Sequence, residues 1–140
     1  MRSCVLEQLV DLFGSTRDGW MNSDLKGWLA PNNIYPGVGD TVKALVEREE
    51  SYIVTTKQAR FTETILSEMA GIQFPADRIF SQTVSGRPKS EVLESLQKNH
   101  PDAESYHFVE DKLSTLEKVR DDNFIQRFPE WRKLNSFVCN

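Results

Sequence analysis

Residues 104–112 read ESYHFVEDK, and this stretch decides how the rest of the chain is interpreted. Its apolar part, Tyr106 to Val109, has the length of a short strand and ends abruptly in two adjacent acids, Glu110 and Asp111. Neighbouring like charges repel, so such a pair destabilises a fold unless a cation or ordered hydrogen-bond donors lie opposite it. The stretch therefore predicts a buried strand that delivers two carboxylates to one point.

Working outward from this strand, short apolar runs alternate with helical patterns. The runs carry β-branched residues without helical period, whereas the segments between them place apolar residues three and four positions apart. Alternation of this kind predicts an α/β fold, a Rossmann-like parallel sheet with flanking helices. The expected strands are 51–56, 78–84, 105–111 and 135–139, and the expected helices are 41–50, 57–71, 90–100, 113–120 and a short one over PEWRKL at 129–134.

The helices expected in the core have recognisable ends and inward faces. Asp40 is predicted to cap the helix over 41–50, and Gly71 is predicted to end the helix over 57–71. In the helix over 90–100, Val92, Leu93 and Leu96 are expected to face the core. The spacing of Leu113, Leu116 and Val119 predicts the helix over 113–120.

The first 30 residues are predicted to be helical in two pieces. Val5, Leu9, Leu12 and Phe13 fall on one face at helical spacing, and a second short piece spans 21–30. Asn22, Ser23 and Asp24 are the candidates for the cap that starts the second piece. Pro31 then interrupts the pattern, and a loop rich in Pro, Gly and Asn follows.

Composition narrows the class of protein. The chain has 140 residues, a formal net charge of −4 and 39% hydrophobic residues, which suits a globular domain and argues against a binder of nucleic acid or of a membrane surface. Its apolar runs are too short for a transmembrane helix. The two cysteines, Cys4 and Cys139, are too few for a secreted disulfide scaffold, and Glu7 and Asp11 interrupt what would be the apolar core of a signal peptide. We therefore expect a cytoplasmic protein.

Polar side chains gather where the expected strands end, which is where α/β proteins bind ligands. They are a pair of hydroxyls, a pair of cations and a pair of carboxylates: Thr55 and Thr56, Arg87 and Lys89, and Glu110 and Asp111. The hydroxyls and cations suit a phosphoryl group, and the carboxylates suit Mg²⁺, which prefers oxygen ligands. The sequence therefore predicts a site for a small phosphorylated molecule with Mg²⁺.

At these residues the sequence resembles the haloacid dehalogenase-like (HAD) hydrolase superfamily. The resemblance spans roughly 33–120 and rests on an ordered set of short motifs: IYPGVGDTVKALVE, YIVTTK, GRPKSEVL and HFVEDKLSTLEKV. It implies that Thr55 is the second-motif hydroxyl, that Lys89, or alternatively Arg87, is the third-motif cation, and that Glu110 and Asp111 are Mg²⁺ ligands. Most members of this superfamily are phosphatases that work through an aspartyl-phosphate.

The first motif of that superfamily, Asp-x-Asp, does not occur in these 140 residues. One interpretation makes Asp11 in VDLFGST a degenerate version of it, at the end of an N-terminal strand. The other interpretation is that the chain begins after the first motif, so that 1–30 is the helical remnant of a cap and 31–140 is a core without its first strand.

Two functions follow. The first is a Mg²⁺-dependent phosphatase, truncated in this chain, in which Thr55 and Lys89 act at the phosphoryl group. The second is a non-catalytic fragment or pseudoenzyme that acts through a protein partner or self-association at unpaired strands.

Overall fold

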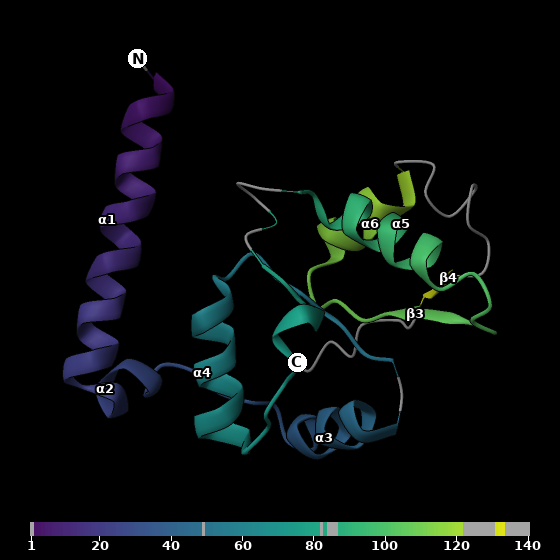
Figure 1. The fold of residues 1–140 in the computed structure, drawn as a ribbon, viewed down its shortest axis with the longest axis horizontal. Helices are drawn as coiled ribbons and strands as arrows, with labels where there is room; N and C mark the ends of the chain where they lie inside the picture. Colours follow the sequence, from purple (N-terminus) through teal and green to yellow (C-terminus); the bar gives the residue numbers. More distant parts are fainter. Residues whose placement is uncertain (1, 49, 82, 84–86, 122–130, 134–140) are drawn as a thin grey trace. The chain divides into compact units, whose positions relative to one another are not determined.

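The computed structural model describes the chain except for residues 1, 49, 82, 84–86, 122–130 and 134–140 (Figure 1). The fold is rich in helix and contains short parallel strands, so it is a mixed α/β structure. In chain order, the helices and strands are α1 (Arg2–Ser23), α2 (Leu25–Leu29), α3 (Val38–Arg48), β1 (Ile53–Val54), α4 (Ala59–Ala70), η1 (Ala76–Arg78), β2 (Ile79–Phe80), α5 (Lys89–Asn99), β3 (Tyr106–Phe108), α6 (Leu113–Asp121) and β4 (Trp131–Lys133).

The chain folds into two compact units. The first contains residues 1–51 and 60–74, and the second contains residues 52–59 and 75–140. The first unit is helical, whereas the second contains all the strands described above. The division into 1–30 and 31–140 concerns the origin of the segments and stays a prediction.

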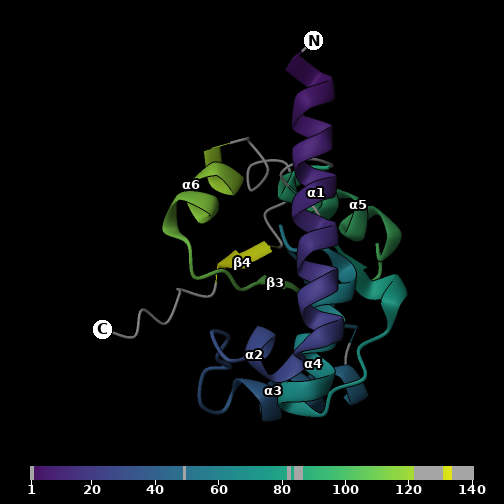
Figure 2. The same cartoon turned by 90° about the vertical axis from the view of Figure 1, so that its left-hand side faces the viewer.

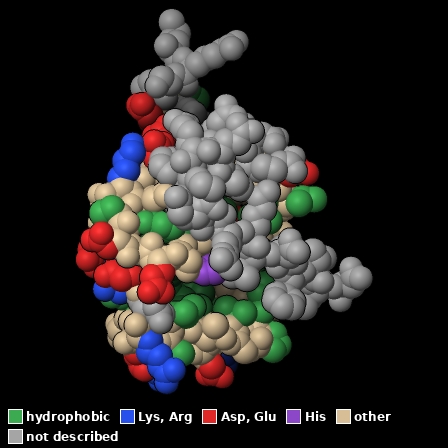
Figure 3. Space-filling model, turned by 90° about the vertical axis from the view of Figure 1, so that its right-hand side faces the viewer, with side chains coloured by type: hydrophobic (Ala, Val, Ile, Leu, Met, Phe, Trp, Pro, Cys, Tyr) green, Lys and Arg blue, Asp and Glu red, His purple; other side chains and the backbone are tan. Residues whose placement is uncertain are grey.

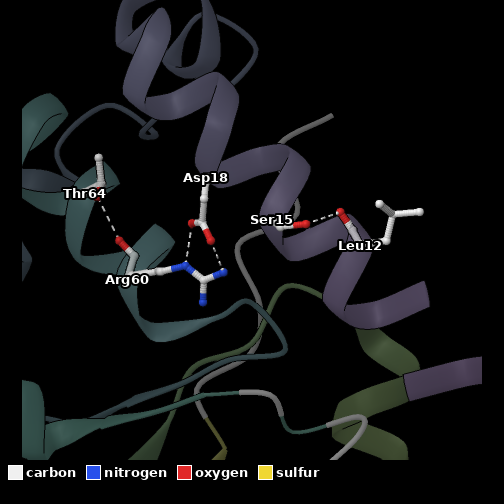
Figure 4. Close-up of polar contacts among 5 residues, drawn as sticks. All are labelled: Leu12, Ser15, Asp18, Arg60 and Thr64. Carbon is white, nitrogen blue, oxygen red and sulfur yellow. Dashed lines mark hydrogen bonds and ion pairs between the residues drawn. The ribbon is translucent and has the colours of Figure 1, made fainter. Parts of the chain in front are cut away.

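In the first unit, an aromatic cluster and an ion pair hold α1 and α2 on α4. The Trp28 ring lies 5.5 Å from the Phe61 ring, and both side chains are buried. The Arg17 guanidinium lies over Phe61, 4.4 Å from its centroid. Beside this cluster, Asp18 accepts two hydrogen bonds from Arg60, at 2.6 and 2.7 Å (Figure 4). Polar and aromatic contacts together therefore fix α1 on α4.

The start of α2 is capped by one of the three predicted candidates, and the end of α4 was correctly predicted. The Asp24 carboxylate accepts a hydrogen bond from the Gly27 N–H at 2.9 Å and so caps α2. Gly71 follows α4 with φ +64°, a left-handed conformation that favours glycine.

The second unit contains two separate two-stranded parallel sheets. β1 pairs with β2, with Ile53 opposite Ile79, and β3 pairs with β4, with Tyr106 opposite Trp131. The helices α5 and α6 supply the core, because Leu93 and Val119 are buried against each other. The partly buried residues that pack against this core come from β1 and β3: Val54, Tyr106 and Phe108. Both sheets thus use the same hydrophobic cluster.

Several expectations from the sequence were wrong. PEWRKL was predicted to be helical, but Trp131–Lys133 forms the strand β4, because pairing with β3 outweighs local propensity. Asp40 lies in the first turn of α3 and does not precede it, because Gly37, with φ +80°, lets the helix begin at Val38. The strand expected at 135–139 lies outside the described residues.

Where helices are described, none combines the length and apolarity that crossing a membrane requires. On the face drawn in Figure 3, acidic side chains outnumber basic ones, in keeping with the net charge of −4.

Candidate functional site

Lys89 and Glu110 form the central contact of the candidate site. Lys89 is the first residue of α5, which Pro88 precedes, and Glu110 follows β3 by two residues. The Lys89 Nζ lies 2.5 Å from the Glu110 Oε2, and the two side chains are 19% and 10% exposed. The second carboxylate oxygen, Oε1, accepts a hydrogen bond from the Lys112 N–H at 3.2 Å. The chain itself therefore supplies a cation, Lys89, and an ordered donor, the Lys112 N–H, to stabilise the Glu110 carboxylate.

The surroundings of Glu110 act on its pKa in opposite directions. Burial raises the pKa, while hydrogen bonds with Lys89, Asp111 and Lys112 lower it. The hydrogen bonds prevail and hold the pKa of the Glu110 carboxyl below its usual range. Glu110 is thus an anion at neutral pH, and the ammonium of Lys89 balances its charge.

Asp111 is the exposed member of the acid pair. Among the described residues, no group of three His, Cys, Asp or Glu side chains is arranged to hold a metal ion. Mg²⁺ commonly binds through one or two carboxylates together with substrate phosphate and water, so a full protein cage is not required. Asp111 fits this mode, whereas the carboxylate of Glu110 is already engaged by Lys89.

Thr55 lies directly after β1 and is held by its backbone. Its N–H donates to the Phe80 carbonyl at 2.8 Å, which continues the β1–β2 pairing by one residue. Its Oγ1 accepts a hydrogen bond from the Lys57 N–H at 3.1 Å. Thr56, the second predicted hydroxyl, is exposed. The two threonines therefore differ, since only Thr55 is partly buried and oriented.

Thr83 is a residue that the sequence analysis missed. Its N–H donates to the Thr55 carbonyl at 3.2 Å, which places it beside Thr55. Its side chain is 8% exposed, and its buried Oγ1 has no hydrogen-bond partner among the residues that the structure describes. A buried hydroxyl is normally satisfied, so this one marks an unusual position. The sequence signal that could have identified Thr83 is its position near the end of the expected strand 78–84, after the apolar residues Ile79 and Phe80.

Arg87 points its guanidinium at α5 itself. It donates to the Glu91 carbonyl at 3.1 Å and to the Ser95 hydroxyl at 2.9 Å. Of the two cations considered for the third motif, Lys89 is therefore the one that contacts an acid of the site. The structure brings together Lys89 with Glu110, and separately Thr55 with Thr83.

Asp11 lies within α1 and not at the end of a strand. The strand that its role as a nucleophile would require is thus replaced by a helix, as the spacing of Val5, Leu9, Leu12 and Phe13 indicated. The interpretation of VDLFGST as a degenerate first motif is wrong in this respect.

Comparisons with known protein families, with curated proteins and with solved structures find no match to this chain.

Proposed function

We propose that this chain carries the phosphate-binding and Mg²⁺-binding part of a haloacid dehalogenase-like hydrolase that acts on a small phosphorylated substrate. The observation that supports this most directly is the contact between Lys89 and Glu110. These residues are 21 positions apart. They are also the third-motif and fourth-motif residues of the resemblance, and a shared site requires them to meet.

The proposed roles follow from hydrogen-bonding capacity. The ammonium of Lys89 has three donors, of which one serves Glu110, so the others remain for a phosphoryl oxygen. The Thr55 Oγ1 accepts from the Lys57 N–H, which leaves its own hydrogen free to be donated to a second phosphoryl oxygen. Asp111 would hold Mg²⁺ together with phosphate and water, and the ion would neutralise charge on the phosphate. Glu110 would orient Lys89.

We also propose that the strands belong to one Rossmann-like sheet, in which a further strand lies between β1 and β3. The separate pairs β1–β2 and β3–β4 support this arrangement, because Val54 and Phe108 use the same core although their strands do not pair among the described residues. In the superfamily, the strand between them carries the nucleophilic Asp-x-Asp. This sequence contains no such motif. We therefore propose that this chain binds phosphate but hydrolyses phosphate esters poorly.

A second candidate function is non-catalytic and depends on a protein partner. It is favoured by the same pairing pattern, since strand edges that are unpaired among the described residues would invite an added strand. Under this proposal the site binds phosphate without hydrolysing an ester.

The test of the first candidate is an assay of the full chain with p-nitrophenyl phosphate and Mg²⁺. Turnover that is lost in Asp111→Ala and Lys89→Met but kept in Lys98→Met would support it. Lys98 is the matched control because it also lies on α5 and pairs with an acid, Glu94, at 2.9 Å, but on the exposed surface. Turnover that survives Asp111→Ala would contradict the first candidate.

The two candidates are separated by measuring phosphate binding in the same samples. Phosphate and Mg²⁺ that protect the chain against thermal unfolding, without turnover, favour the non-catalytic candidate. Turnover that disappears in Asp11→Asn would instead assign the nucleophile to Asp11. Absence of both binding and turnover would contradict both candidates.

A further inference from the structure

The helix α1 carries an exposed apolar stripe that the proposed function does not use. We define the stripe by five side chains, each between 47% and 63% exposed: Val5, Leu9, Leu12, Phe13 and Trp20. At 100° per residue, these positions fall within an arc of about 100° on one side of the helix. Single exposed apolar residues are ordinary, but a contiguous stripe marks a surface that binds something.

The opposite side of α1 already has its partner within the first unit. Arg17 lies over the Phe61 ring, and Asp18 pairs with Arg60 on α4. Asp18 falls on the side of the helix opposite the stripe, whereas Arg17 lies at the edge of the stripe, where its guanidinium also covers the Phe13 ring at 5.4 Å. The N-terminal half of α1 also extends beyond α2 and α4 (Figures 1 and 2). The stripe is thus not the face that holds α1 on its own unit.

The spacing along the stripe is that of a helix–helix contact. Val5, Leu9, Leu12 and Thr16 follow one another at intervals of four, three and four, which is the a/d spacing of a coiled coil. The acids of this half of the helix, Glu7 and Asp11, lie outside the stripe on its polar side. Between Val5 and Trp20 the stripe carries no charged side chain, and Thr16, the polar member of this spacing, donates its hydroxyl to the Leu12 carbonyl at 2.7 Å, so the stripe suits another helix of the same character.

The size of the stripe matches what a pair of identical helices requires. Half-exposed side chains of this size offer on the order of 100 Å² each, so two copies would bury about 1,000 Å² in total. That area is near the lower bound for a specific interface. We propose that α1 pairs with α1 of a second copy of this chain through the stripe. Interfaces at this lower bound are commonly weak and transient, so the equilibrium should be sought at micromolar concentrations.

The pairing is antiparallel. In this direction the helix dipoles oppose each other favourably, and the a/d register places Leu9 opposite Leu12 of the second copy. Phe13 and Trp20 flank these central layers. The inference is independent of the phosphate site, because no residue of that site lies on α1.

Sedimentation equilibrium of the full chain over roughly 1–100 µM tests the proposal. A monomer–dimer equilibrium is expected, and the double variant Leu9→Gln, Leu12→Gln is expected to weaken it at least about tenfold with unchanged circular dichroism. The matched control is Leu45→Gln, which replaces a 42% exposed leucine on α3 and should leave the equilibrium unchanged. A monomer throughout, or equal weakening by the control, would overturn the proposal.

Disulfide trapping tests the direction of pairing. In a background with Cys4→Ser and Cys139→Ser, a mixture of the Leu9→Cys and Leu12→Cys chains is oxidised. Antiparallel pairing predicts that the mixed 9–12 product exceeds the 9–9 and 12–12 products. An excess of the 9–9 and 12–12 products would overturn the antiparallel arrangement.

Discussion

The ammonium of Lys89 lies 2.5 Å from the carboxylate of Glu110, and both side chains are largely buried at the junction of α5 and β3. This contact joins two elements of the second unit and also defines the candidate site. The contribution of this contact to the free energy of unfolding and its contribution to phosphate binding can be measured in separate experiments.

A double-mutant cycle on Lys89 and Glu110 should give a clear coupling. Lys89→Met leaves a buried carboxylate without its cation, so it should lower the free energy of unfolding by about 2 kcal/mol. The double variant Lys89→Met, Glu110→Gln should recover part of that loss. Urea unfolding measures the cycle. The same cycle on the exposed pair Lys98 and Glu94 should give about 0.5 kcal/mol or less, and equal couplings would contradict the account.

The pH dependence of stability should carry the signature of Glu110. Because its folded-state pKa lies below the ordinary value of 4.5, its contribution is fully present above about pH 4.5 and is lost as pH falls through the lower, folded-state pKa. Urea unfolding at a series of acidic pH values should show this loss. Glu110→Gln should flatten the curve in that window. A variant that keeps the wild-type slope would rule out Glu110 as its source.

Removing the hydroxyl of Thr83 should not destabilise the free protein. Thr83→Val keeps the shape and deletes a buried hydroxyl without a partner in the described part of the chain, so the free energy of unfolding should stay constant or rise by about 1 kcal/mol. Thermal unfolding measures it. The comparison variant is Thr64→Val, whose hydroxyl donates to the Arg60 carbonyl at 2.8 Å on the surface (Figure 4). A clear loss in Thr83→Val would show that the hydroxyl is satisfied in the folded chain.

The guanidinium of Arg17 should stabilise the first unit more than the ion pair beside it. Arg17 lies near three aromatic rings, those of Phe13, Trp28 and Phe61, so Arg17→Met should cost about 1 kcal/mol through the lost cation–π contacts. Asp18→Asn weakens a bidentate pair that solvent screens, so it should cost less than Arg17→Met. The reverse order, measured by urea unfolding, would contradict this ranking.

The sequence predicted what depends on neighbours along the chain. The capping of α2 by Asp24 and the end of α4 at Gly71 follow from local backbone chemistry, and the burial of Val92, Leu93 and Leu96 follows from helical spacing. Helical spacing also placed Val5, Leu9, Leu12 and Phe13 on one face of α1. Whether that face is exposed depends on contacts with other parts of the fold, which spacing does not show.

The sequence did not predict what depends on distant contacts. The strand Trp131–Lys133 exists because β3 lies beside it, and the environment of Thr83 is set by the Thr55 carbonyl. The motif set placed Lys89 and Glu110 in one site, but it did not predict that the two side chains pair. That Lys89 neutralises the acid, a role the sequence analysis gave to Mg²⁺, required the folded arrangement of α5 and β3.

The central claim is that Lys89, Thr55 and Asp111 form a phosphate site. Calorimetric titration of the full chain with inorganic phosphate in the presence of Mg²⁺ tests it most directly. Saturable binding is expected, weakened at least about tenfold in Lys89→Met and unchanged in Lys98→Met. No binding by the wild-type chain, or binding that Lys89→Met leaves intact, would contradict the claim.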